Sequence, residues 1–136
     1  MQARVFSPRS GDWVTRGEGI RTLALVTRAI GGRSFLNGIT EIAGGKEIPF
    51  HSHNCEESVV VLEGIGTMDV DGEISDLLPF DATWIPSGVP HRFVNRQSMP
   101  LRILWMYGSA DATRTFLSNG LEVRVGDLAD AYDLQS

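Results

Sequence analysis

Short runs of alternating apolar and polar residues, separated by glycine-containing turns, recur along the whole chain. The clearest alternates from residue 66 to residue 70 and ends at Asp71-Gly72, a pair that favours a two-residue hairpin because both positions tolerate positive φ. No segment sustains the 3.6-residue apolar period of an amphipathic helix. We therefore predict strands over residues 4–7, 20–28, 33–43, 48–53, 57–63, 66–70, 73–78, 83–86, 91–95, 101–107, 113–117 and 121–125.

About a dozen short strands at short spacing are typical of an all-β sandwich or barrel. The chain has 136 residues, and neither an internal repeat nor a linker divides it. The sequence thus predicts a single all-β domain over residues 1–136.

Composition restricts the possible partners. The formal net charge is −5 with a pI near 5.1, and no basic stripe is present to meet nucleic-acid phosphates or an anionic membrane. No apolar run is long enough to cross a membrane, and a single cysteine excludes an internal disulfide. We expect a cytoplasmic protein whose partner is a small molecule or a second copy of itself.

The histidines are the candidate chemistry. The chain has three, and two of them, His51 and His53, are separated by one residue at the end of a predicted strand. Residues i and i+2 of a strand point to the same side, so both imidazoles aim at one place. Glu57 begins the next strand, and His91 begins another after a tight Pro-rich turn. Imidazole and carboxylate together suit iron, manganese, nickel, copper or zinc.

These residues stand in a recognisable pattern. Gly45-x5-His51-x-His53-x3-Glu57-x6-Gly64 resembles the first motif of the cupin family, and Pro86-x-Gly88-x2-His91-x3-Asn95 resembles its second motif. The two motifs span residues 45–64 and 80–95. Phe80 replaces the glycine with which the second motif usually begins, so we expect that corner of the chain to turn differently.

The resemblance implies a double-stranded β-helix, a jelly-roll barrel of two antiparallel sheets. It also implies that His51, His53, Glu57 and His91 hold one divalent metal ion, with iron or manganese favoured and zinc or nickel as alternatives. Glu57 is either a ligand or a general base. Homodimers are common in such proteins, and the predicted strand at residues 4–7 is a candidate for adding to a partner's sheet.

Strand alternation also predicts the surroundings of the metal. Val59 and Phe93 share the inward side with Glu57 and His91, and the more apolar face of residues 101–107 adds Trp105. Phe35 completes the predicted pocket. An apolar and aromatic cavity beside one metal suits a small oxygenated organic compound.

Three functions remain open. The first is a metal-dependent enzyme, with dioxygenase-like chemistry favoured and isomerase, lyase or cyclase chemistry as the alternative. The second is a non-catalytic small-molecule-binding protein. The third is a structural homodimer in which the metal is incidental. All three stay open because one scaffold can host many activities.

Overall fold

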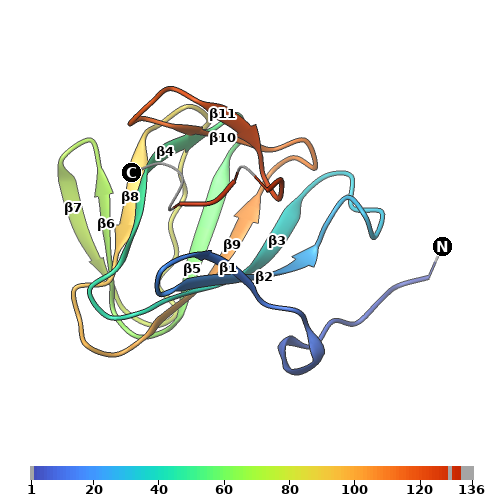
Figure 1. The fold of residues 1–136 in the computed structure, drawn as a ribbon, viewed down its shortest axis with the longest axis horizontal. Helices are drawn as coiled ribbons and strands as arrows, with labels where there is room; N and C mark the ends of the chain where they lie inside the picture. The colour runs from blue at the N-terminus through green and yellow to red at the C-terminus, as the bar shows by residue number, and fades with distance from the viewer. Residues whose placement is uncertain (1, 129, 133–136) are drawn as a thin grey trace.

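A computed structural model describes residues 2–128 and 130–132, whose strands form two antiparallel sheets (Figure 1). One sheet has the order β1-β2-β3-β9-β5 and contains β1 (Val14–Gly17), β2 (Ile20–Val26), β3 (Leu36–Ile42), β9 (Leu101–Tyr107) and β5 (Glu57–Glu63). The other has the order β11-β10-β4-β8-β6-β7 and contains β11 (Glu122–Arg124), β10 (Thr113–Phe116), β4 (Glu47–His53), β8 (His91–Val94), β6 (Gly66–Val70) and β7 (Glu73–Leu77). The predicted all-β jelly-roll barrel is confirmed.

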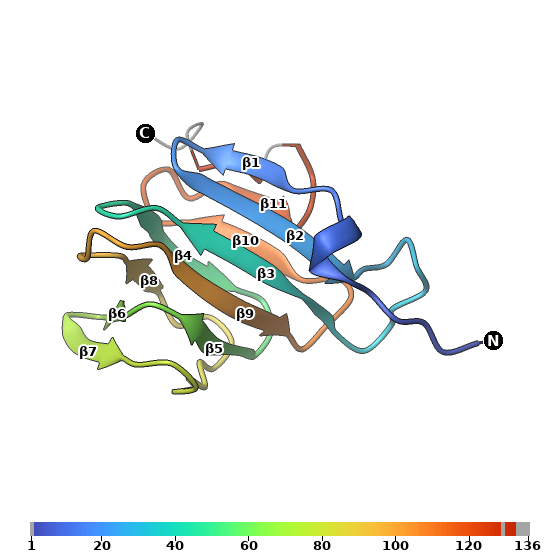
Figure 2. The same ribbon diagram turned by 90° about the horizontal axis from the view of Figure 1, so that it is seen from below.

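The core lies between the sheets, which Figure 2 shows as two layers. Along β9 the residues Leu101, Ile103, Trp105 and Tyr107 are buried, whereas the intervening side chains are more exposed. Phe93 and Phe116 face them from the other sheet and are also fully buried. Burying each such side chain contributes roughly 1.5–3 kcal/mol to folding. The period-2 pattern therefore closes the barrel and fixes which residues face its interior.

The predicted hairpin at Asp71-Gly72 joins β6 to β7, and both turn residues have positive φ, 52° and 84°. The helical structure described is η1 (Pro8–Ser10), a single 3-10 turn. No helix among the described residues is long and apolar enough to cross a membrane.

The predicted strand at residues 4–7 is wrong. Among the residues that the structure describes, this segment has no strand partner, and it runs away from the barrel (Figure 1). The strand of this region is β1, which pairs with β2 and is mostly exposed. Its side chains bury little apolar surface, so the hydrophobic pattern did not indicate it, and main-chain pairing holds it in place.

The predicted strand at residues 83–86 forms only isolated bridges. Ile85 pairs with Glu57 and Ala82 pairs with Val60 along the outer edge of β5. Between them the Thr83 hydroxyl accepts the hydrogen bond of the Val59 amide at 3.0 Å. A side-chain oxygen therefore takes a position that a backbone carbonyl would fill in a continuous ladder.

Phe80 takes the place of the first glycine of the second motif and adopts a glycine-like backbone conformation. Its φ is +74°, in the left-handed region that favours glycine, so the corner turns as a glycine would turn it, contrary to the prediction. The Phe80 amide donates to the Val61 carbonyl at 2.7 Å, and the Leu78 amide donates to the Asp81 carboxylate at 2.8 Å. These bonds impose the turn, while the Phe80 ring itself is 81% exposed.

Replacing Phe80 by glycine should therefore stabilise the protein. Relief of the left-handed strain is worth about 1–2 kcal/mol, and the added freedom of glycine in the unfolded chain returns roughly 0.5–1 kcal/mol. We expect the midpoint of thermal unfolding of F80G to rise by about 3 °C. Asp71→Gly is the control, because Asp tolerates positive φ and little strain is there to relieve. A lower midpoint for F80G would show that the exposed ring makes a stabilising contact.

Candidate metal centre

The three histidines of the chain meet inside the barrel. His51 and His53 lie on β4, and His91 begins the neighbouring β8 directly opposite His51. All three are at most 4% exposed. Their candidate ligand atoms lie within 4.8 Å of one another. The alternation predicted from the sequence thus brings the imidazoles to one point.

Backbone hydrogen bonds fix how each ring is oriented. The Nδ1 atoms of His51, His53 and His91 lie 2.7, 2.9 and 2.9 Å from the carbonyl oxygens of Pro49, Thr113 and Val89, respectively. A carbonyl oxygen only accepts, so each Nδ1 donates its proton. The Nε2 atom of each neutral ring then carries a free lone pair, which is the tautomer that a metal ligand requires.

Glu57 reaches this cluster from the opposite sheet. Its Oε1 lies 2.7 Å from His91 Nε2, and its Oε2 lies 3.5 Å from His53 Nε2. Among the described residues, Oε1 and both of these nitrogens are buried without a hydrogen-bond partner. A carboxylate oxygen against a nitrogen lone pair is repulsive unless a proton or a cation lies between them. The arrangement therefore calls for a positively charged species.

The donor set fits a divalent transition metal. Three neutral imidazoles and a carboxylate suit iron, manganese, nickel, copper or zinc, whereas calcium and magnesium prefer all-oxygen sites. Burial lowers the pKa of His51 well below its ordinary value, and the charge of Arg114 lowers it further. Burial by itself raises the pKa of Glu57, but contacts with His53 and His91 outweigh burial and lower it. Neutral imidazole and ionised carboxylate are the ligating forms.

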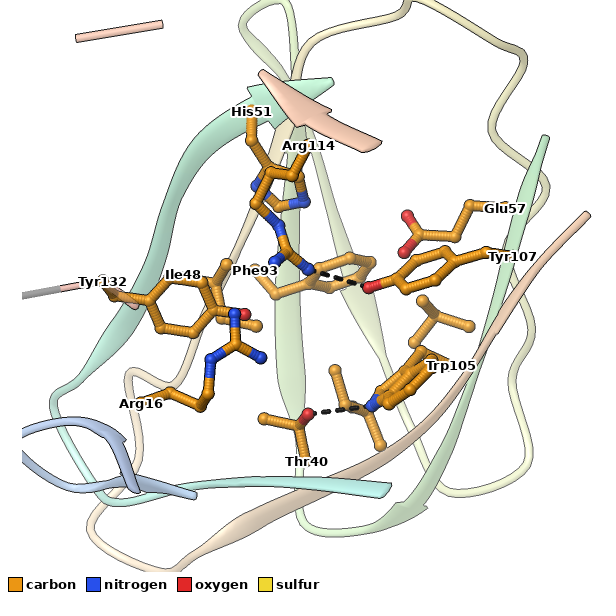
Figure 3. Close-up of a pocket in the computed structure, with 12 residues that line it drawn as sticks. Arg16, Thr40, Ile48, His51, Glu57, Phe93, Trp105, Tyr107, Arg114 and Tyr132 are labelled. Atoms are coloured by element: carbon orange, nitrogen blue, oxygen red, sulfur yellow. Dashed lines mark hydrogen bonds between the residues drawn. The ribbon is translucent and has the colours of Figure 1, made fainter. Parts of the chain in front are cut away.

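The space beside the cluster is nearly filled (Figure 3). Its lining includes three residues predicted for the pocket, Val59, Phe93 and Trp105. It also includes Arg16, Arg114 and Tyr132. About 10 Å³ remains free, close to the least volume that holds one water molecule. A substrate therefore enters only if some of these side chains move.

The cavity is not the apolar and aromatic one expected from the sequence, because two arginines line it. Arg114 lies on β10 opposite His53, is 2% exposed, and donates to the Tyr107 hydroxyl at 2.9 Å. Burial lowers the pKa of Arg114, but Tyr132, Tyr107 and Asp130 outweigh this effect and raise it well above its ordinary value. A permanent positive charge therefore stands beside the imidazoles.

Phe35, the remaining residue predicted for the pocket, does not line this cavity. It precedes β3 and its side chain is 40% exposed. Leu36, the next residue, is buried, so strand alternation turns Phe35 outward. This placement corrects the prediction.

Sequence reasoning missed Arg16, Arg114, Asp130 and Tyr132. A signal existed for Arg114, because it alternates with Thr113 and Thr115 and shares its parity with the buried Phe116. A charged residue on the inward side of a strand is a candidate site residue. Arg16 and Tyr132 gave no such signal, because they meet only through the fold: the Tyr132 amide donates to the Arg16 carbonyl at 2.8 Å.

The fold and the histidine cluster define a small double-stranded β-helix protein with a candidate metal centre. The cupin domain family matches residues 38–107, about half of the chain. The chain belongs to this family.

Comparisons with individual proteins extend this result. An uncharacterized protein of Methanocaldococcus jannaschii is 34% identical over 61 residues, which is 45% of this chain and 49% of that protein, so the match spans about half of the relative's length. The polyketide cyclase RemF from Streptomyces resistomycificus has 22% identity and a TM-score of 0.73, covering 98% of this chain and 92% of its own. A salicylate 1,2-dioxygenase mutant from Pseudoaminobacter salicylatoxidans has 20% identity and a TM-score of 0.62, covering 69% of this chain and 26% of its own. At these identities the two structures show a shared fold.

Proposed function

We propose that this cupin is a mononuclear metal enzyme acting on a small oxygenated organic compound. The observation that carries the proposal is the set of buried lone pairs without partners, His53 Nε2, His91 Nε2 and Glu57 Oε1, which face one another beside His51. Leaving such atoms unsatisfied is costly, so their arrangement is best explained by a cation that they bind.

The chain's own residues divide the work. His51, His53 and His91 hold the cation, and a bound divalent ion supplies Lewis acidity to a substrate oxygen. Glu57 completes the ligand set or, released from it, accepts a proton from the substrate. The inner walls formed by Val59, Phe93 and Trp105 exclude water and orient the organic part of the substrate.

Dioxygenase-like chemistry with iron or manganese is the first reaction to test. A metal-dependent cyclase, isomerase or lyase is the second candidate, and the position of Glu57 favours it. The three imidazoles form a cluster without Glu57, which contacts only two of them. A carboxylate at the margin of a metal site can act as a general base without emptying the site.

Anaerobic purification followed by elemental analysis and oxygen uptake tests the proposal. A panel of enols and catechols is offered to the protein, with Glu57→Gln as the matched variant and Glu56→Gln, an exposed neighbour, as the control. Iron or manganese with oxygen uptake supports the dioxygenase. Zinc or nickel, with turnover but without uptake, supports the second candidate. Failure to bind any of these metals contradicts both.

We also propose that the protein is a cytoplasmic homodimer. Residues 4–7 pair with no strand in the described part of their own chain, so their backbone could add to a partner's sheet. Light scattering of the protein without its first ten residues tests this role. A loss of the dimer supports it, and an unchanged dimer refutes it.

A further inference from the structure

Two arginines share one carboxylate inside the barrel. Arg114 Nη1 contacts Asp130 Oδ1, and Arg16 Nη2 lies 3.0 Å from the same oxygen. The side chains of Arg114 and Asp130 are 2% and 1% exposed, and that of Arg16 is 11% exposed. Two positive charges therefore stand against one negative charge, and the Tyr132 ring packs against both guanidinium groups, with its centroid 4.4 Å from Arg16 Cζ and 5.4 Å from Arg114 Cζ.

The hydrogen bonding of this group is incomplete. The Nε atoms of Arg16 and Arg114 are buried and have no acceptor among the residues that the structure describes. A buried donor without an acceptor destabilises the folded protein. Asp130 Oδ2, meanwhile, accepts from the Gly126 amide at 3.2 Å and so does not supply the missing acceptors. A ligand carboxylate in this place could accept from the free donors that Asp130 does not reach.

The position of the arginines connects them to the metal centre. Both line the same small cavity as His51 and Glu57, and Figure 3 shows the Arg114 side chain between His51 and Tyr107. A small molecule that reaches the imidazoles therefore also lies within reach of a guanidinium group. Guanidinium recognises carboxylate through paired N–H donors.

We propose that Arg16 and Arg114 form a carboxylate-binding subsite, in which Asp130 takes the place of the substrate's carboxylate until the substrate displaces it. This inference rests on the proposed function and narrows its substrate to a small organic carboxylate. The exchange also accounts for the nearly filled cavity, because displacing Asp130 and Tyr132 makes room for the ligand. Among the described residues, two backbone bonds of this segment would have to break, from Asp130 N to the Asp127 carbonyl and from Tyr132 N to the Arg16 carbonyl.

Acetate, which has the size and charge of an aspartate side chain, is the probe. Thermal unfolding of metal-free Asp130→Ala is followed against acetate concentration at constant ionic strength, with neutral acetamide as the matched ligand. We expect acetate but not acetamide to raise the unfolding midpoint. Wild-type protein should bind acetate about 10-fold more weakly or worse, because its own Asp130 competes.

A second variant identifies where acetate binds. In Asp130→Ala/Arg114→Gln, acetate should no longer raise the unfolding midpoint. If it still does, acetate binds elsewhere and the proposal is overturned. Where Asp130→Ala does not fold, Asp130→Asn, which keeps the volume, is used in the same titration. Equal responses to acetate and acetamide would show that the arginines serve only the fold. Because no metal is present, this result is independent of whether the metal centre is catalytic.

Discussion

Alanine in place of His51 or His91 should lower the affinity for a divalent cation by about 100-fold or more. Loss of a group that merely orients a metal ligand costs about 10–100-fold, and loss of a ligand costs more. Each of these imidazoles is held by a backbone carbonyl, so its Nε2 is already oriented when the cation arrives. Isothermal titration calorimetry of the metal-free protein with Zn²⁺ or Mn²⁺ measures this loss of affinity.

Two adjacent carboxylates provide a matched pair, with Glu57 as the test and Glu56 as its control. Glu57→Gln should weaken metal binding, whereas Glu56→Gln should leave it unchanged, because Glu56 is exposed and bonds to the Trp84 indole at 2.9 Å. Stoichiometric metal binding by Glu56→Gln would show that an exchange of carboxylate for amide next to the site does not by itself disturb it. Wild-type affinity in both histidine variants would contradict the ligand assignment.

Gly64→Ala should destabilise the fold by about 3 kcal/mol or more, from left-handed strain of roughly 1–2 kcal/mol and overpacking of roughly 1–3 kcal/mol. Gly64 ends the first motif with φ at +85°, and a Cβ there would lie 2.5 Å from the Pro100 carbonyl oxygen. Backbone cannot move aside as a flexible side chain can. Thermal unfolding should show a midpoint lower by about 10 °C.

Gly120→Ala separates the two causes. Its φ is +69°, but nothing lies within 4 Å of the added Cβ, so only the left-handed strain of roughly 1–2 kcal/mol remains. The difference between the two variants measures the steric contact with Pro100. Equal midpoints for them would show that the β5–β6 corner yields, and that the close approach does not constrain it.

The clustering of the three histidines could be predicted from sequence because its determinants are local. His51 and His53 face one way by strand alternation, and the motif spacing supplies Glu57 and His91. The same alternation predicts the inward positions of Val59, Phe93 and Trp105. Strand alternation therefore predicts the orientation of residues that depends only on their own strand.

Arg114 could be placed on the inward side of its strand by alternation, but its meeting with Arg16 and Asp130 could not be predicted, because these residues are remote in sequence. Arg16, Arg114 and Asp130 come from the two ends of the chain and meet only when β1 and the segment after β11 are placed against the barrel. β1 buries too little apolar surface to be recognised from its pattern. The prediction for the corner at Phe80 was wrong for a different reason. Hydrogen bonds with its neighbours impose a backbone conformation that its own side chain disfavours.

Anomalous diffraction from a crystal of the metal-loaded protein tests the central claim most directly. Data collected on both sides of the absorption edge of the bound metal locate that ion independently of the protein atoms. An ion held by the three histidines should give one peak about 2.0–2.2 Å from the Nε2 atoms of His51, His53 and His91, on the side that faces Glu57. A peak elsewhere, or no peak between the imidazoles of a protein shown to contain metal, would contradict this claim.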